Sequence, residues 1–361
     1  MNQSISFQQA AWKRLKKNTG AVIGMIIIFF AVFLAVFAYF IAPDSSPNAN
    51  RIILEMGGKK PGYTQTFLKV KKERTVKKSG LLQQLVVGKE DAFYYVPIQK
   101  FEIKDDSVIV QKYIDEDLTE RQSFSNNQSA PVPIVTTTFY LGTDKYGRDI
   151  LSRLIVGTRI SLSVGLITVL ISLLIGLSLG SMAGYFRGKT DELIMWLVNV
   201  IWSIPTLLLV FAITLLLGKG FWQIFIAVGL TMWVNVARLV RGQVLAVREL
   251  EYIEATKALG FSNFRTISRH ILPNIMGPVM VIAASNFASA IVIEAGLSFL
   301  GVGVQPPQPS WGLMIKENYN FIITQNPMLA LAPGFAIMIL VLAFNLFGNG
   351  LRDALSVRGK V

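Results

Sequence analysis

The 361-residue chain contains no cysteine and one histidine, and charged residues make up only 16% of it. The absence of cysteine excludes a disulfide framework, a thiolate nucleophile and a cysteine-ligated zinc. A single histidine leaves little room for a histidine metal cluster or a histidine-based triad, so we expect no metal site and no catalytic residues. Soluble domains usually carry about 25% charged residues. This deficit, with 52% hydrophobic residues, argues against a single cytosolic globule.

The charge balance is strongly positive, with 35 Lys and Arg, 22 Asp and Glu, and a net charge of +13. Such a charge suits either a nucleic-acid-binding protein or a membrane protein with basic cytoplasmic loops. The positions of the charges decide between these two classes.

Six stretches are long and apolar enough to cross a bilayer, which takes about 20 residues. Together the six stretches contain one charged residue, Glu294. We therefore expect an all-α membrane protein with six transmembrane helices. The predicted spans are Ala21–Ala42, Ile160–Phe186, Leu193–Gly218, Gly220–Ala237, Asn274–Leu300 and Met328–Gly350.

Basic residues predict the orientation of these spans through the positive-inside rule. A cytoplasmic N-terminus places residues 187–192, 238–273 and 351–361 in the cytoplasm. Together with the N-terminus these segments hold 15 basic and six acidic residues. The topology accounts for much of the positive charge, and we expect both termini to be cytoplasmic and no nucleic acid to bind.

A long polar segment, residues 44–140, separates the first span from the second. It contains 14 basic and 12 acidic residues. Phe101–Lys104 alternates polar and apolar residues, Val108–Ile114 is rich in β-formers, and Ser123–Pro133 has the composition of a flexible linker. We expect a small β-rich extracytoplasmic insertion.

Ala183–Thr190 loosely fits the phosphate-binding P-loop pattern, with alanine at the first glycine position. A P-loop follows a β-strand and opens a helix within an α/β domain. This segment instead leaves one predicted span and enters the next. We expect the chain to bind no ATP, so any ATP would bind to another chain.

The most informative stretch, 251–274, lies in a predicted cytoplasmic segment. Gly260 occupies the position where a helix takes a left-handed C-terminal residue. Ser262 or Asn263 can cap a following helix, and Pro273 is expected to end it. The pattern predicts two short helices separated by a turn.

This stretch resembles the EAA loop of ABC importer permeases. That pattern is Glu-Ala-Ala, three residues, Gly, nine residues, Ile, one residue and Leu-Pro. Thr256 replaces the second alanine, and His270 occupies the isoleucine position. The resemblance implies that seven residues couple the chain to an ATPase: Glu254, Ala255, Thr256, Gly260, His270, Leu272 and Pro273.

A second resemblance narrows the family to the C-type permeases of dipeptide, oligopeptide and nickel importers. It rests on Leu141–Asp149 with Ser152, Arg153, Gly157 and Arg159, on Gly301–Gly312, and on Asn349–Asp353. It implies a type I importer permease fold, with residues 1–43 and 141–361 forming the membrane part, 44–140 the insertion, and 248–273 the coupling loop.

The resemblance also implies partners and a location. It implies a second, B-type permease, two cytoplasmic ATPases that bind ATP and Mg²⁺, and an extracytoplasmic solute-binding protein, in a bacterial cytoplasmic (inner) membrane with lipid around the spans. The implied cargo is di- or oligopeptides. Nickel chelates, glutathione or another small solute remain alternatives within the same architecture.

Polar residues within the spans are candidates for the translocation path or its gate. Pro205 predicts a kink after Ser203, and Asn199 lies six residues before it. Glu294 is an intramembrane carboxylate, which is costly and a functional candidate by default. The alternative for each is a structural contact between helices.

Two other classes remain possible from the residues alone. A secondary transporter would need no ATPase, but it would give no reason for the 251–273 pattern. A membrane enzyme would need catalytic groups that converge on one face, and the sequence shows no such pair.

Overall fold

The structure is a computed structural model that describes residues 7–73, 80–104, 107–115, 118–125, 129–218, 220–323 and 326–355. The chain forms two compact units. The first unit comprises Met1–Val32, Ser161–Gln305 and Ala336–Val361, and the second comprises Phe33–Ile160 and Pro306–Phe335. The helices α2, α5 and α13 each begin in one unit and end in the other.

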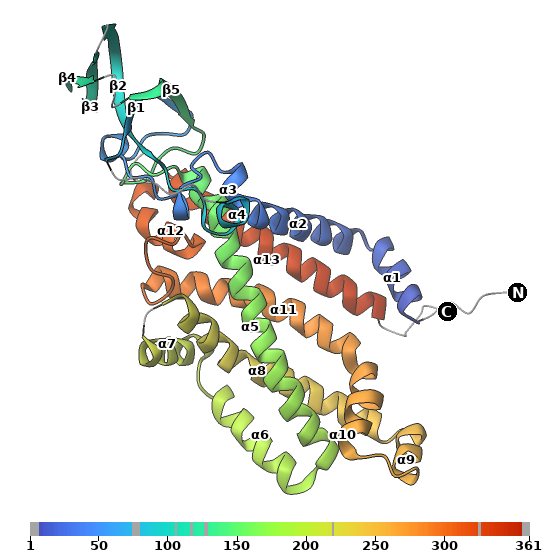
Figure 1. The fold of residues 1–361 in the computed structure, drawn as a ribbon. Helices are drawn as coiled ribbons and strands as arrows, with labels where there is room; N and C mark the ends of the chain where they lie inside the picture. Colours follow the sequence, from blue (N-terminus) through green and yellow to red (C-terminus); the bar gives the residue numbers. More distant parts are fainter. Residues whose placement is uncertain are drawn as a thin grey trace, which may run out of the picture. The chain divides into compact units, whose positions relative to one another are not determined.

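Most of the described chain is helical (Figure 1). Within the described residues, five helices are long and apolar enough to cross a membrane. They are α2 (Thr19–Val36), α5 (Ile150–Phe186), α8 (Phe221–Arg248), the continuous helix Asn263–Leu300, which ends in α11 (Leu272–Leu300), and α13 (Met328–Leu355). These five confirm five of the six predicted spans. The amphipathic helix α1 (Phe7–Lys17) precedes α2, and the short α3 (Ala38–Ile41) follows it.

The remaining predicted span, 193–218, consists of two helices, α6 (Gly188–Trp202) and α7 (Thr206–Leu217), which meet at an angle of 91°. The break comprises Ser203, Ile204 and Pro205. Proline has no backbone N–H and disfavours helical conformation in the residue before it. The kink predicted at Pro205 is confirmed, and its size makes this span a bent pair of helices.

The helix α8 is the packing centre of the first unit and contacts α6, α7 and α11. Its partner face on α5 carries glycines four residues apart, Gly176, Gly180 and Gly184. A Cβ atom at Gly180 would lie 2.6 Å from the carbonyl oxygen of Ala237. Small residues at this spacing let two helix backbones approach closely, which is how helices associate in lipid.

The insertion contains a five-stranded antiparallel sheet in the order β4-β3-β2-β1-β5. Its strands are β1 (Tyr63–Lys71), β2 (Phe93–Lys104), β3 (Ser107–Asp115), β4 (Leu118–Ser125) and β5 (Ser129–Phe139), and α4 (Leu81–Val87) lies between β1 and β2. Alternate residues of the strands pack into two separate apolar clusters, one of which includes Leu68 and Val108 and the other Phe67 and Tyr113. The predicted β-rich insertion is confirmed.

The linker predicted at Ser123–Pro133 is wrong for the described part of that segment. Ser125 pairs with Ser107 at the end of β4, and Ser129 pairs with Val70 at the start of β5. The composition suggested a linker, but pairing with neighbouring strands overrides local preference. β5 is an edge strand, where the two prolines of this segment are tolerated. Residues 126–128 lie outside the described residues.

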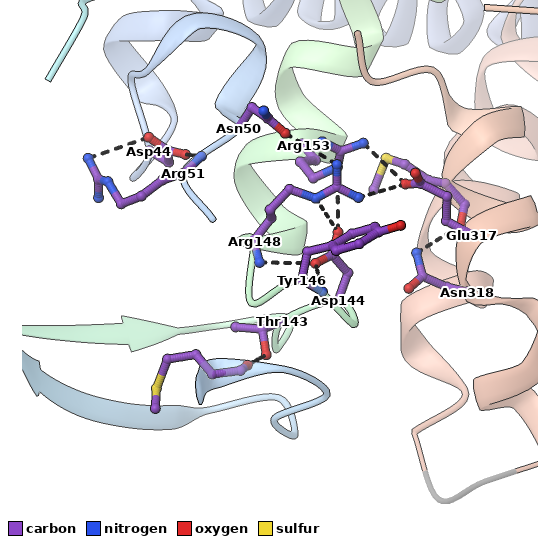
Figure 2. A network of polar contacts seen from close by, with 12 residues as sticks. Asp44, Asn50, Arg51, Thr143, Asp144, Tyr146, Arg148, Arg153, Glu317 and Asn318 are labelled. Carbon is purple, nitrogen blue, oxygen red and sulfur yellow. Dashed lines mark hydrogen bonds and ion pairs between the residues drawn. The ribbon is translucent and has the colours of Figure 1, made fainter. Parts of the chain in front are cut away.

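A buried ion network lies in the second unit (Figure 2). The Arg148 guanidinium donates to Asp144 at 2.6 Å, to Glu317 at 2.8 Å and to Asn50 at 3.2 Å. Arg153, whose side chain is 1% exposed, donates to Glu317 at 3.4 Å. Two guanidinium groups and two carboxylates therefore balance one another inside the fold.

This network joins segments that are far apart in the sequence. Asn50 follows the 3₁₀ helix η1 (Pro47–Ala49), Arg148 precedes α5, and Glu317 lies on α12 (Trp311–Asn318). Two further 3₁₀ turns, η2 (Leu54–Met56) and η5 (Tyr319–Ile322), belong to the same unit. A buried charge without its partner is costly, so each of these segments fixes the position of the others.

The segment 141–154 adds further hydrogen bonds around the network. The Thr143 hydroxyl donates to the carbonyl of Met56. Burial raises the pKa of the Asp149 carboxyl, which accepts hydrogen bonds from the Ser152 N–H and hydroxyl. The Trp311 indole donates to the carbonyl of Leu154 at 3.0 Å. These contacts give the Leu141–Asp149 motif a structural role.

Replacing Glu317 should destabilise the fold more than replacing an exposed acid. Glu317→Gln leaves two buried guanidinium groups with one carboxylate, which should cost about 3 kcal/mol. Glu249→Gln is the matched control, because its ion pair with Arg187 is largely exposed and such pairs contribute about 0–1 kcal/mol. Thermal unfolding in detergent measures both, and equal shifts in the unfolding temperature would contradict the network's role.

Candidate functional site

The segment 251–273 forms a helix, a turn and a second helix, as the sequence predicts. α9 (Glu251–Ala258) ends in a tight turn in which the Gly260 N–H donates to the carbonyl of Lys257 and the Phe261 N–H to that of Thr256. Gly260 has a φ of +71°, in the left-handed region that glycine adopts without strain. The Ser262 side chain then caps α10 (Asn263–Arg265).

The prediction that Pro273 ends the second helix is wrong. The helix continues from α10 through the π-helical turn η4 (Thr266–Ile271) directly into α11. In this turn the Leu272 N–H donates to the carbonyl of Ile267, five residues earlier. Pro273 has no backbone N–H to donate, but the helix continues through it. The chain from Asn263 to Leu300 is therefore one helical rod of 38 residues.

Buried side chains fix this segment to the rest of its unit. Ile253 and Ile271 are fully buried in a cluster with Val240 and Val244 of α8 and with Tyr185 of α5. These anchors were missed by sequence reasoning, because their partners lie on distant helices. Their burial makes the segment a fixed part of the packed unit.

Two of the predicted coupling residues, Thr256 and His270, contact other residues of the same segment. Thr256 is buried, and its hydroxyl lies 3.3 Å from that of Thr266, so it connects the two helices of the segment. The His270 ring lies 5.7 Å from the ring of Phe261. The side chain of Asn274 donates to the His270 carbonyl at 2.6 Å. These contacts hold the turn closed.

The opposite side of the segment is exposed and apolar. Glu254 and Ala255 are exposed, and so are Leu259 and Phe264, at 72% and 81%. We call Glu254, Ala255, Leu259 and Phe264 the exposed face. Among the residues that the structure describes, no ion pair to Glu254 is formed. Large apolar side chains grouped at a surface are typical of a site for another protein.

A cavity of about 410 Å³ lies beside the break between α6 and α7. Trp202 and Thr206, on either side of the break, line it together with residues of α8, α11 and α13. Its polar groups are neutral: Thr206, Thr231, Asn235, Ser289 and Asn345. The cavity is partly open, and a concave site that combines apolar side chains with convergent polar groups is the usual form of a small-molecule site.

Three of the predicted path residues lie at the break without lining this cavity. Asn199 accepts a hydrogen bond from Arg238 at 2.9 Å, and the same guanidinium lies 3.7 Å from the ring of Trp202. Ser203 donates to the carbonyl of Val200 at 2.7 Å, and Pro205 precedes the first residue of α7. These residues shape the break that places Trp202 and Thr206 against the cavity.

The fourth, Glu294, is fully buried on α11 next to the cavity-lining Ile293. Its carboxylate accepts a hydrogen bond from Ser298 at 2.6 Å, and the Ser298 hydroxyl accepts one from the Val304 N–H at 3.0 Å. These bonds connect the end of α11 with the loop that follows Gly301. Within the described chain, Glu294 is not among the residues that line the cavity.

Comparisons with known proteins agree with this arrangement. Residues 176–360 match the family described as binding-protein-dependent transport system inner membrane component. Residues 6–55 match the N-terminal transmembrane domain of oligopeptide transport permease C. The first match contains both the cavity and the 251–273 segment.

Two relatives and one solved structure show similarity to the chain. The dipeptide transport system permease protein DppC of Bacillus subtilis is 32% identical over 98% of this chain and 86% of its own length. The glutathione transport system permease protein GsiD of Pectobacterium atrosepticum is 40% identical over 61% of this chain and 73% of its own. A chain of the inward-facing MetNI methionine ABC transporter covers 56% of this chain and 96% of its own, with 19% identity and a TM-score of 0.47.

The apolar helices, the matched family and a relative that aligns with nearly the whole chain lead to one assignment. The chain belongs to the family of binding-protein-dependent transport system inner membrane components and is a multi-pass permease of the ABC peptide-importer group.

Proposed function

We propose that the chain forms half of the translocation path for di- or oligopeptides in an ATP-driven importer. A second, B-type permease supplies the other half, and an extracytoplasmic solute-binding protein delivers the cargo. Two cytoplasmic ATPases bind ATP and Mg²⁺ and drive the cycle. This chain transports and does not itself hydrolyse ATP.

The observation that carries this proposal is the rod from Asn263 to Leu300. Its first residues belong to the 251–273 segment, and Ala288, Ser289, Val292 and Ile293 near its other end line the cavity. A packed helix transmits displacement along its axis, whereas a flexible loop would dissipate it. An ATPase that moves the exposed face therefore moves one wall of the cavity.

The role of each coupling residue follows from its place in the segment. Glu254 and Ala255 contact the ATPase, together with the apolar Leu259 and Phe264. Thr256, Gly260 and His270 hold the turn, and Leu272 and Pro273 lie where the segment joins α11. Asn199, Ser203 and Pro205 form the bend beside the path, and Glu294 holds the end of the rod.

The cavity supports a peptide cargo. Its polar groups are hydroxyls and amides, which can exchange hydrogen bonds with peptide groups, and its apolar walls accept varied side chains. A relative that aligns with almost the whole chain is a dipeptide transport permease. Glutathione, itself a short peptide, is the second candidate because of the relative that transports it.

The charges support an orientation with both termini in the cytoplasm and residues 44–140 outside it. The turn after α5 and the 238–273 region carry eight of the 13 basic side chains that follow residue 160. This places the exposed face in the cytoplasm, where the ATPases bind. The division into residues 1–43, 44–140 and 141–361, with the coupling loop at 248–273, follows from the same topology.

Replacing Gly260 should uncouple transport and leave the protein in the membrane. Gly260→Val places a β-branched side chain at a positive φ, which is strained by about 1–2 kcal/mol, although a Cβ there meets no other atom within 4 Å. We expect transport and substrate-stimulated ATP hydrolysis to fall at least about tenfold. Both are measured in proteoliposomes of the co-purified complex.

Gly260→Asn is the matched control, because asparagine tolerates the left-handed region. It should retain most of the transport activity. Equal activity of the valine variant and the wild type would contradict the role of the turn.

The exposed face should be within reach of an ATPase. The chain has no cysteine, so Phe264→Cys carrying a photo-crosslinker gives a single labelled position. After mild-detergent purification from native membranes, mass spectrometry should identify a P-loop ATPase joined to this position and a second permease that co-purifies. Leu118→Cys, which is exposed on β4 of the insertion, is the control and should capture no ATPase. A Phe264→Cys sample without ATPase would contradict the proposed function.

A further inference from the structure

The insertion contains a short helix, α4, whose exposed side chains are largely apolar. α4 lies within a nine-residue stretch, Gly80–Gly88, that contains no charged residue. The exposed fractions are 76% for Leu81, 82% for Leu82, 59% for Val86 and 50% for Val87. Several adjacent apolar residues exposed on one element mark an interaction surface.

Two membrane-spanning elements hold this helix in place. It packs against α3, which continues the first span (Figure 1). The Arg159 guanidinium of α5 donates to the carbonyls of Leu85 and Val86, both at 3.0 Å. These carbonyls belong to the last turn of α4, which has no partners for them within the helix. Arg159 thus caps α4, and a cation is also favourable at this helix end.

The residues that contact α4 indicate its position relative to the bilayer. Arg159 is the last charged residue before the uncharged stretch 160–186, and α3 closes the uncharged stretch 21–42. The guanidinium also lies 5.0 Å from the ring of Tyr39 on α3. Arginine and tyrosine are typical of the boundary between lipid and water, where a charged or polar tip meets an apolar body. α4 is therefore held at the level where both spans leave the hydrocarbon.

The apolar side chains of α4 also continue the apolar surface of the first span. Phe37, Phe40 and Ile41 at the end of that span are exposed by 39%, 51% and 41%. Exposed side chains on a membrane-spanning helix contact lipid or another membrane subunit. Protein interfaces usually surround their apolar core with a polar, charged rim, whereas α4 itself carries no charge.

We propose that α4 is an interfacial helix that inserts Leu81, Leu82, Val86 and Val87 among the acyl chains of the leaflet on the insertion's side, with Arg159 as the residue that positions it. Short apolar helices bind in this way when their apolar side chains reach the boundary between headgroups and hydrocarbon. The insertion is then attached to the membrane by a contact of its own, in addition to its chain connections. This assignment does not depend on the cargo.

Spin labelling tests the proposal directly, because the chain contains no cysteine. A nitroxide is attached to Leu82→Cys in the full complex, reconstituted in vesicles of phosphatidylethanolamine and phosphatidylglycerol. Collision rates are measured with oxygen, which concentrates in lipid, and with a water-soluble nickel chelate. Unmodified complex gives the background from cysteines of other subunits.

Two control positions bracket the result. Phe30→Cys on α2 reports the lipid environment, and Ile103→Cys, which is 62% exposed on β2, reports water. We expect the ratio of oxygen to nickel collisions at position 82 to exceed that at position 103 several-fold and to approach that at position 30. A ratio equal to that at position 103 overturns the proposal. Low collision rates with both reagents also overturn it, because they show that protein covers α4.

The role of Arg159 has its own test in the same system. In the Arg159→Gln background, the label at position 82 should become more mobile and collide more with the nickel chelate, because the two hydrogen bonds to α4 are lost. The label at position 30 should be unchanged, which shows that the fold is retained. An unchanged signal at position 82 would contradict the positioning role of Arg159.

Discussion

The continuity of the helix from Asn263 to Leu300 is the constraint on which the account of this permease depends. If the helix ended at Pro273, the 251–273 segment would be a loop attached to the membrane part by a joint. The structure has no such end, because the π-helical turn at Thr266–Ile271 runs directly into α11 and the backbone stays helical through Pro273. The buried Ile253 and Ile271 then hold the segment against α8. One continuous helix therefore connects this segment with the residues of α11 that line the cavity.

In the second unit, buried ion pairs hold segments that are distant in the sequence against one another. Asp144, Arg148, Arg153 and Glu317 are buried together and tie the start of α5 to α12. Residues that give the chain its family resemblance at 141–159 are thus occupied with structural tasks, such as the capping of α4 by Arg159. Thr256 in the first unit and Arg148 in the second both lie at junctions between elements, whereas the cavity is lined by neutral groups.

The sequence predicted what local patterns determine and missed what distant contacts determine. Uncharged runs identified the spans, alternation identified the sheet, and Gly260 identified the turn. The 91° bend, the strand pairing of Ser125 and Ser129 and the helix through Pro273 depend on neighbouring elements that a linear pattern does not reveal. The cavity was missed for the same reason, since Thr231 and Asn345 meet only after α8 and α13 have packed.

A distance measured between two positions on the helix Asn263–Leu300 tests whether this helix is rigid. Spin labels at Phe264→Cys and Val292→Cys, 28 residues apart on the helix, should lie about 42 Å apart at 1.5 Å per residue. We expect pulsed electron paramagnetic resonance on the complex to give a narrow distance distribution, with the same mean in the absence of nucleotide and with a non-hydrolysable ATP analogue. A broad distribution, or a mean that changes when the nucleotide binds, would show that the helix bends at the proline and would contradict a rigid lever.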